Sequence, residues 1–428
     1  MAGAVSVQTA ATSVSDRRWQ QRSPSVVFLS PTGQIGGAER VLIDMIAGMR
    51  ARDPLATITL VASADGPLLP VVRETGARVV VLPFPSSLAT LGDAQAGSLS
   101  GTVGVLLRAL RAIPDVLRYR ASLRSLLNRE RPDVIHTNGA KMHLLGALAG
   151  SDVAPVVWHL HDYPGSRRVM RRALKASVSR VALLIANSES VARDARAVFG
   201  PDVSVRTVLN GVDTARFTPV GDRLDLDALS GMAAPDGDVV RIGLVATYAK
   251  WKGHELFFRA LGALPATAAW RCYVVGGPVY ETQGSQWTRG ELQKMAAAAG
   301  MADRVGFTGL VTDVPSALRA LDVVVHASTL PEPFGLVIAE ALACGRPVVT
   351  SGSGGAIEVA GAGSGATVVR TNDATALAAT IARLIESPMA LGRAGENARG
   401  TAVSRFDRDS FVAAIVDAHD AVLVHRAR

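Results

Sequence analysis

Short apolar runs alternate with longer segments of helical periodicity along most of the chain. The first run, Ser25–Ser30, lacks polar alternation, which is typical of a strand buried on both faces. The next segment, Gly37–Arg50, has its apolar residues at helical spacing and predicts an amphipathic helix. Buried strands separated by helices predict a parallel sheet that is covered by helices on both faces.

The predicted strands fall into two series with a polar segment between them. The first series comprises Ser25–Ser30, Thr57–Ser63, Ala77–Leu82, Val134–His136, Val156–Leu160 and Leu183–Ala186. The second comprises Val240–Ala246, Cys272–Val275, Val305–Thr308, Val323–His326 and Pro347–Thr350. Helices are predicted between the second-series strands and beyond them, at His254–Leu264, Glu291–Ala299, Pro315–Ala320, Val337–Cys344 and Ala374–Ile385. The pattern predicts an α/β protein with two consecutive Rossmann-like, doubly wound domains.

Composition shifts suggest the domain boundaries. Residues 1–23 are rich in small polar residues, lack the apolar core of a signal peptide, and are expected to form a flexible tail. We expect a first domain at 24–216, a linker at 217–238, a second domain at 239–404 and a final helix at 405–428. Asp225 and Asp227 lie in the linker, and we interpret them as part of a solvated loop rather than a metal site.

The chain has 428 residues, of which 48% are hydrophobic, so it can bury a large core and is not a disordered chain. No apolar stretch reaches the roughly 20 residues that span a bilayer. The cysteines, Cys272 and Cys344, are too few for a disulfide framework or a thiolate zinc site. They fit a reducing compartment, and we expect a cytoplasmic protein.

Positive charge is concentrated in the first half of the chain. Residues 1–216 contain 26 Lys and Arg against 16 Asp and Glu, whereas the remainder contains 19 against 21. Two stretches, 106–131 and 166–175, carry most of this excess. The asymmetry indicates an anionic partner, with the inner face of a membrane as one candidate, although a solvated helix face would have the same composition. Few aromatic residues lie among these arginines, which argues against nucleic acid.

The most informative segment is His326–Glu358, where Glu332 and Glu340 flank the predicted start of a helix. A helix start beside a glycine presents N–H groups that attract an anion, and carboxylates accept hydrogen bonds from sugar hydroxyls. A sugar, a diphosphate and a ribose follow each other in this order in a nucleotide sugar. For an isolated pair, however, a surface loop residue and a dipole-stabilised helix charge explain the same pattern. Neither a dinucleotide fingerprint nor a P-loop motif is present.

In combination, these motifs resemble those of the GT-B glycosyltransferases of the retaining family 4, also called glycosyl transferases group 1. Glu332-Pro333-Phe334-Gly335 with Glu340 matches the family's E-x7-E signature. Gly354–Glu358 resembles its G-G-x-x-E motif, and Asn210–Phe217 resembles its N-G-V-D-x-x-x-F motif. The resemblance runs from about Ser25 to Phe406.

The resemblance implies two Rossmann-like domains facing a cleft, with the final helix returning to the first domain. It also implies metal-independent, hexosyltransferase-like transfer of a sugar from a UDP- or GDP-linked donor, with retention of configuration. The acceptor would be a hydroxyl of a glycan, a lipid-linked molecule or a small molecule. The donor is a substrate, so no cofactor is expected and no metal is required.

The resemblance also assigns candidate roles to individual residues. The catalytic candidates are His161, Lys252 and Glu332. The donor-binding candidates are Gly36, Gly37, Lys250, Gly277, Phe334, Gly335, Leu336, Val337 and Glu340. The acceptor-side candidates, which end or follow a first-domain strand, are His136, Asn138 and Lys141. In this scheme Glu332 binds the sugar hydroxyls, Glu340 the ribose, and Lys252 with the 334–337 amides the diphosphate.

One position departs from the family. Its G-R-L-x-x-x-K-G motif has an arginine where this chain has Thr247, although Lys252 falls on the lysine position. A leaving diphosphate needs compensating charge, which Lys250 or Arg40 could supply. The departure keeps open a non-catalytic nucleotide-sugar-binding protein, and a nucleotide-sugar epimerase is the other alternative on this fold.

Overall fold

The computed structural model describes residues 23–89, 99–166, 168–265, 267–279 and 285–426. The predicted tail, apart from Ser23, lies outside these residues. By its internal contacts the chain divides into two compact units. The first unit comprises Met1–Ala186, Asp194–Val208 and Val412–Arg428, and the second comprises Asn187–Arg193 and Leu209–Phe411.

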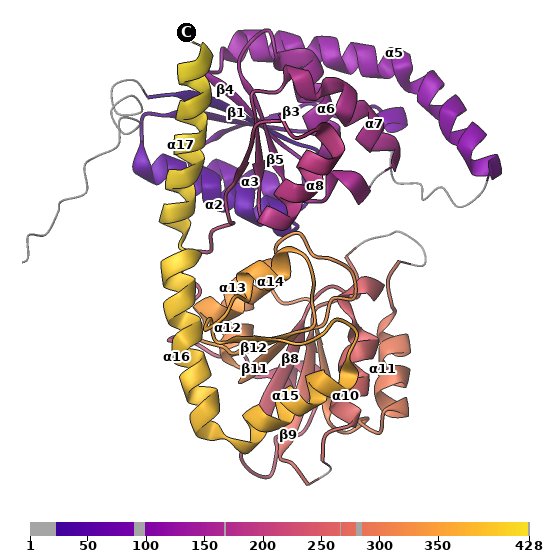
Figure 1. Ribbon diagram of the computed structural model, residues 1–428, viewed down its shortest axis with the longest axis vertical. Helices are drawn as coiled ribbons and strands as arrows, with labels where there is room; N and C mark the ends of the chain where they lie inside the picture. Colours follow the sequence, from indigo (N-terminus) through magenta and orange to yellow (C-terminus); the bar gives the residue numbers. More distant parts are fainter. Residues whose placement is uncertain (1–22, 90–98, 167, 266, 280–284, 427–428) are drawn as a thin grey trace, which may run out of the picture. The chain divides into compact units, whose positions relative to one another are not determined.

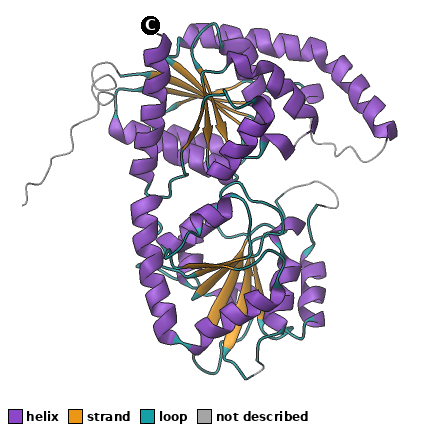
Figure 2. Cartoon of the chain, in the orientation of Figure 1, coloured by secondary structure: helices purple, strands orange, loops and turns teal. Residues whose placement is uncertain are grey.

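The first unit contains a seven-stranded parallel sheet in the order β3-β2-β1-β4-β5-β6-β7 (Figures 1 and 2). The strands are β1 (Ser25–Ser30), β2 (Thr57–Ala62), β3 (Arg78–Val81), β4 (Val134–Asn138), β5 (Val156–Leu160), β6 (Leu183–Ala186) and β7 (Val205–Thr207). The helices are α2 (Gly37–Arg52), α3 (Leu68–Glu74), α4 (Ser86–Ala89), α5 (Leu99–Glu130), α6 (Ala140–Gly150), α7 (Arg168–Ser177), α8 (Glu189–Phe199) and α17 (Arg408–Arg426). Helix α8 spans the boundary between the units, and α17 belongs to the first unit from Val412 onward. Short 3-10 turns lie at Pro164–Ser166 and Val178–Arg180.

The second unit contains a six-stranded parallel sheet in the order β10-β9-β8-β11-β12-β13. Its strands are β8 (Val240–Val245), β9 (Trp270–Val275), β10 (Val305–Gly309), β11 (Val323–His326), β12 (Val348–Thr350) and β13 (Ala366–Val368). Its helices are α9 (Leu226–Ser230), η3 (Lys250–Lys252), α10 (His254–Gly262), α11 (Arg289–Ala298), α12 (Val314–Arg319), α13 (Leu336–Ala343), α14 (Gly355–Val359), α15 (Ala374–Glu386) and α16 (Pro388–Arg405).

The prediction of two doubly wound α/β domains is confirmed. In each sheet the earliest strand lies inside the sheet, with β1 between β2 and β4 and β8 between β9 and β11. At such a point the connections run in opposite directions, and open α/β sheets bind ligands beside the carboxyl ends of these strands. The carboxyl ends of β1 and β4 and of β8 and β11, with those of the neighbouring β5 and β9, are therefore the places to look for a site.

Both faces of the second sheet are buried. Val324 on β11 packs into an apolar cluster with residues of α12, α13 and α16. Its neighbours Val323 and Val325 pack into a second cluster with residues of α10 and α15. Successive side chains of a strand point to opposite faces, so a strand covered on both sides must be apolar at every position. This is why the sequence shows continuous apolar runs without alternation.

The interpretation of Asp225 and Asp227 as a solvated loop is wrong for Asp227. Asp225 caps α9 by accepting a hydrogen bond from the Ala228 amide at 2.9 Å. Asp227 is buried, and its carboxylate accepts hydrogen bonds from Tyr273 at 2.7 Å, Arg271 at 2.7 Å and Arg241 at 3.1 Å. Burial alone would raise the pKa of Asp227, but these donors lower it overall, so the carboxylate stays charged. The second half of the predicted linker is thereby fastened to β8 and β9.

Candidate functional site

A buried carboxylate lies just after the carboxyl end of β11. Glu332 is 8% exposed, and its Oε1 accepts a hydrogen bond from Lys252 Nζ at 2.7 Å. Its Oε2 accepts from the Ser328 hydroxyl at 2.7 Å and from His326 Nε2 at 2.6 Å. Burial would raise the pKa of Glu332, but the neighbouring His326 and Lys252 hold it well below its ordinary value. Glu332 is therefore ionised and fixed through both oxygens.

The two glycosyltransferase-like motifs hold each other in place around this carboxylate. The Glu332 amide donates to the Ser353 carbonyl at 3.0 Å, and the Gly355 amide donates to the Glu332 carbonyl at 2.8 Å. His326 Nδ1 lies 2.9 Å from the Thr350 hydroxyl on β12. The loops after β11 and β12 thus form one hydrogen-bonded unit that orients Glu332.

Helix α13 begins directly after this loop. Its N-cap, Gly335, has a φ of 86°, a left-handed conformation that favours glycine. The Leu336 and Val337 amides fall in the first turn, where helix N–H groups lack intrahelical acceptors. The ring of Phe334 is 3% exposed and packs edge-on against Phe406, so its side chain belongs to the core. The side chain of Phe334 is therefore not a donor-binding candidate, whereas its backbone amide remains one.

Glu340 lies on α13, one turn beyond this amide pair, and is 7% exposed. Gly277 follows β9, and its carbonyl accepts a hydrogen bond from the Tyr248 amide at 3.1 Å. This bond ties the end of β9 to the loop that leads to the lysine pair Lys250 and Lys252.

The two lysines of the loop after β8 have different surroundings. Lys252 Nζ lies 4.0 Å from the centre of the Trp251 ring while it donates to Glu332. Lys250 is exposed, and its Nζ lies 4.4 Å from the centre of the Trp287 ring. Both are cation–π distances. The structure therefore brings Lys252 to the buried carboxylate and holds Lys250 against an indole.

The backbone at position 253 requires the glycine that ends the lysine motif. Its φ is 76°, and a Cβ there would overlap the carbonyl oxygen of Ala327 at the end of β11. Gly253→Ala is expected to lower the free energy of unfolding by about 2–4 kcal/mol, because left-handed strain and a backbone clash add. Urea unfolding checks this, with Gly290→Ala as control, because a Cβ there meets nothing within 4 Å. Equal stability of the two variants would contradict the prediction.

In the first unit, His161 follows the carboxyl end of β5 and is half-buried. Its Nε2 lies 2.9 Å from Asn138 Oδ1 at the end of β4, so this ring nitrogen carries the proton and donates. Burial lowers the pKa of His161 to about 4, which keeps the ring neutral near pH 7. Asn138 is 2% exposed, and its Nδ2 has no hydrogen-bond partner within the described residues. Lys141, on α6, is half-buried.

Two predicted residues of the first unit lie differently from the expectation. His136 is 0% exposed and contacts two other histidine rings, so it is a core residue rather than an acceptor contact. The Gly36 amide donates to Glu39 Oε2 at 3.1 Å, so this N–H is already occupied at the start of α2. Gly37 is exposed in the first turn of α2, and a Cβ there would meet nothing within 4 Å.

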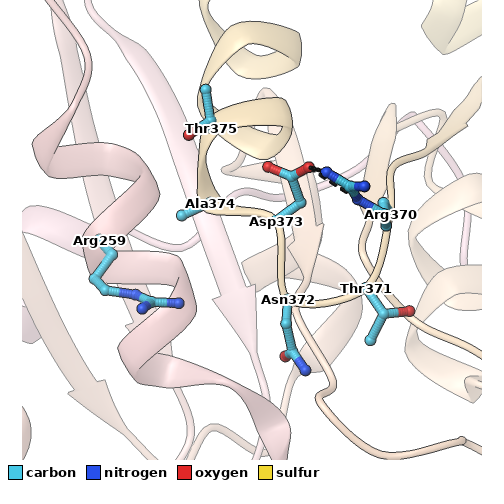
Figure 3. A pocket seen from close by; sticks show the side chains of 7 residues that line it. All are labelled: Arg259, Arg370, Thr371, Asn372, Asp373, Ala374 and Thr375. Carbon is cyan, nitrogen blue, oxygen red and sulfur yellow. Dashed lines mark hydrogen bonds and ion pairs between the residues drawn. The ribbon is translucent and has the colours of Figure 1, made fainter.

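The structure also shows a surface hollow of about 490 Å³ beside the start of α15 (Figure 3). It is lined by Arg259 of α10 and by residues 370–375, and Arg370 pairs with Asp373 at 2.8 Å. Asp373 also caps α15 through the Ala376 amide at 2.9 Å. The predicted site residues do not line this hollow, and its charged pair is explained by helix capping.

Sequence reasoning missed three residues that shape these sites. His326 ends a strand and Ser328 follows it, so their place at the carboxyl end of β11 was available as a signal. His419 touches His136 from a position 283 residues away in the chain. Nothing in the local pattern of α17 indicates that contact.

Comparison with known proteins finds a glycosyltransferase family model for each half of the chain. The family model described as Glycosyltransferase Family 4 matches residues 35–216, and the one described as Glycosyl transferases group 1 matches residues 233–401.

Curated relatives agree with this placement. The lipopolysaccharide core biosynthesis mannosyltransferase LpsB of Rhizobium meliloti is 30% identical over 228 residues, 52% of this chain and 62% of that protein. A D-inositol 3-phosphate glycosyltransferase of Acidothermus cellulolyticus is 31% identical over 311 residues, 68% of this chain and 63% of that protein. The chain thus matches less than two thirds of the length of these relatives.

Among solved structures, Anabaena Alr3699/HepE in complex with UDP superimposes with a TM-score of 0.74 at 27% identity, covering 93% of this chain and all of that one. Sucrose-phosphate synthase from Thermosynechococcus elongatus has a TM-score of 0.75 at 18% identity, covering 94% and 100%, which supports the fold alone. With both motifs, both sheets and both family matches in agreement, the chain belongs to the group 1 glycosyltransferases with the GT-B fold.

Proposed function

We propose that this protein transfers a sugar from a nucleotide-diphosphate donor to an acceptor hydroxyl, with retention of anomeric configuration. The observation that carries the proposal is the ionised, buried Glu332, held by Lys252 and His326 beside the start of α13. A buried carboxylate with a cationic partner at a helix N-terminus provides acceptors for hydroxyls and donors for an anion within one small region. Those are the groups that a sugar diphosphate presents.

The second unit would bind the donor. Lys252 and the amides of Leu336 and Val337 would offset the charge of the leaving diphosphate, which is the largest electrostatic demand of the reaction. Glu332 would accept hydrogen bonds from the sugar hydroxyls, and Glu340 from the ribose. Lys250 would add positive charge for the diphosphate, and Gly277 would lie on the nucleotide side.

The first unit would supply the acceptor side and the catalytic candidate His161. His161, neutral near pH 7, and Asn138, whose buried Nδ2 has no hydrogen-bond partner among the described residues, lie at the carboxyl ends of neighbouring strands. Lys141 is a further acceptor-side candidate, whereas Gly37 at the exposed start of α2 stays a donor-binding candidate. An acceptor hydroxyl in a glycan, a lipid-linked molecule or a small molecule could bind such polar groups.

Related proteins support a nucleotide-sugar donor. Anabaena Alr3699/HepE was solved with UDP, with UDP and glucose, and with UDP-glucose, at 26–27% identity to this chain. A Mycolicibacterium smegmatis relative, 33% identical over 216 residues, is named as GDP-mannose-dependent. We therefore propose a UDP- or GDP-linked donor.

A nucleotide panel tests the proposal. UDP, GDP or one of their sugars is expected to raise the melting temperature, since a ligand at 100 times its Kd adds about 2.7 kcal/mol to a protein that binds it only when folded. Lys252→Met should lose this stabilisation, and Lys294→Met, a control on the exposed side of α11, should keep it. Absence of stabilisation by every nucleotide and sugar would contradict the proposal.

Product analysis then separates the activities. Transfer to an acceptor with the donor's anomeric configuration, read by NMR, supports a retaining transferase. Tight donor binding without transfer or hydrolysis would identify a non-catalytic binder, as the Thr247 position allows. An epimerised donor formed without any acceptor would identify an epimerase.

We further propose that the first unit binds the anionic inner face of a membrane from the cytoplasm. Arg171, Arg172 and Lys175 are exposed on α7, and Ile113 and Leu117 of α5 are exposed apolar residues. Within the described ranges no helix combines the length and apolarity needed to cross a bilayer. Basic residues near an anionic surface contribute about 1 kcal/mol each.

Co-sedimentation with vesicles tests membrane binding. The protein is expected to bind phosphatidylserine vesicles at low salt, and to bind phosphatidylcholine vesicles weakly. A variant with Arg171, Arg172 and Lys175 changed to Glu should lose at least roughly 100-fold in affinity, because removing three positive charges alone costs about 3 kcal/mol and the added carboxylates are repelled. Equal sedimentation of the variant, or none of the wild type, would contradict this proposal.

A further inference from the structure

Three histidine rings of the first unit are joined in a row by their ring nitrogens. His419 Nε2 on α17 lies 2.9 Å from His136 Nδ1 on β4, and His136 Nε2 lies 3.2 Å from His159 Nδ1 on β5. Each of the three residues is 0% exposed. We call His419, His136 and His159 the histidine row.

The row lies on one face of the first sheet. Residues two apart on a strand share a face, so His136 lies on the same side as Asn138, and His159 on the same side as His161. Asn138 and His159 are direct partners in the β4–β5 register. The contact with His419 places α17, drawn in yellow in Figure 1, over this face. The opposite face has its own arrangement, in which His143 of α6 stacks on Trp158.

In a row of neutral imidazoles, all ring-to-ring hydrogen bonds must run in the same donor-to-acceptor direction. Each ring-to-ring hydrogen bond needs one N–H and one lone pair, and a neutral imidazole has one of each. If His419 Nε2 donates, His136 must carry its proton on Nε2 and donate to His159. Burial lowers the pKa of all three rings, which disfavours a charged member. The tautomer of His419 therefore decides those of His136 and His159.

The row ends at the candidate site. The His159 and His161 rings are 4.1 Å apart between centroids, and His161 donates to Asn138, the direct partner of His159 in the sheet. His161 is the half-buried member of the group and lies at the carboxyl end of β5. Three buried polar rings are costly to fold unless they satisfy one another, whereas apolar residues would fill the space without that requirement. The described residues hold no group of three or more His, Cys, Asp or Glu arranged for a metal ion.

We propose that His419 is a positioning residue for His161. It fixes the tautomers and the orientation of the His136 and His159 rings, and His161 packs against the His159 ring. The inference rests on the proposed function only for the role of His161 in sugar transfer. Helix α17 then contributes to the reaction through a side chain that touches neither donor nor acceptor.

Two substitutions at one position test the inference. His419→Gln retains an amide nitrogen near the place of Nε2, whereas His419→Leu fills the space without a polar atom. Ile415→Ala is the matched control, because Ile415 is equally buried on α17 and its truncation costs packing alone.

The imidazole ¹⁵N signals of histidine-labelled protein give the first measurement. His419→Leu is expected to shift the His159 and His161 signals, His419→Gln to leave them near their wild-type positions, and Ile415→Ala to leave them unchanged. In folded His419→Leu protein, an unchanged His161 signal would overturn the inference.

Kinetics give the second measurement. His419→Leu is expected to lower kcat roughly tenfold to a hundredfold, because small misplacements of site groups have effects of that size. The KM for the donor should change by less than about threefold, and His419→Gln should recover most of kcat. Failure of the Gln variant to recover either measurement would also overturn the inference. If the wild type transfers no sugar, the proposed function fails, and the ¹⁵N signals still decide the inference.

Discussion

Replacing Glu332 with Gln is expected to lower the rate of sugar transfer by at least about 10²–10³-fold, the effect of removing one preorganised electrostatic group from a site. The substitution keeps the size of the side chain and removes the charge that Lys252 faces at 2.7 Å. Lys252, 16% exposed in its side chain, would then be a nearly buried cation without its counter-ion. The orientation of Lys252 toward a diphosphate would then change, and so would the contact between the side chain at position 332 and the sugar.

The measurement is the transfer rate with the best donor of the nucleotide panel, together with urea unfolding. Breaking a buried ion pair by removing one partner typically costs about 3–5 kcal/mol, so a loss of stability of that order should accompany the loss of activity. Glu291→Gln is the control, because Glu291 caps α11 through Thr288 on the exposed side of the same unit. A folded Glu332→Gln protein with wild-type transfer would remove Glu332 from the site.

Acid is expected to destabilise the first unit well before its carboxylates titrate. Burial lowers the pKa of His143 to about 3 and those of His161 and His419 to about 4, from an ordinary value of 6.5. Between pH 6.5 and 4 the unfolded chain binds these protons and the folded chain does not. The free energy of unfolding is therefore fully retained above pH 6.5 and falls as the pH falls. Each such histidine removes about 2 kcal/mol at pH 5.

Urea unfolding at pH 7.5 and pH 5.0 checks this expectation. His143→Asn keeps a hydrogen-bonding atom near Thr137, which lies 2.7 Å from His143 Nδ1, but does not titrate. The variant should lose about 2 kcal/mol less than the wild type between the two pH values. Trp158→Phe changes the ring stacked on His143 and should lower stability equally at both. The same pH dependence in wild type and His143→Asn would refute the expectation.

Local patterns predicted the strands that run through the two cores, because a strand buried on both faces must be apolar throughout. They did not predict β7 and β13, which have three residues each and are too short for a recognisable period. The loop motifs predicted that Glu332 and Lys252 belong together, and the structure joins them.

The remaining features depend on contacts between distant segments. The occupied amide of Gly36 depends on the rotamer of Glu39, which the Gly-rich sequence does not specify. The burial of His136 depends on His419, and that contact requires the return of α17 to the first unit. A hydrophobic period identifies which face of an element is covered and does not identify the element that covers it.

The anchoring of Asp227 has a practical consequence for separating the two halves. A fragment that starts at residue 239, where the sequence suggests the second domain begins, would lack this carboxylate and leave Arg241 and Arg271 without its charge. The phenol of Tyr273 would lose its acceptor at the same time. Expression of the second half alone should therefore begin upstream of α9, so that the fragment retains the carboxylate that pairs with Arg241 and Arg271 of its own sheet.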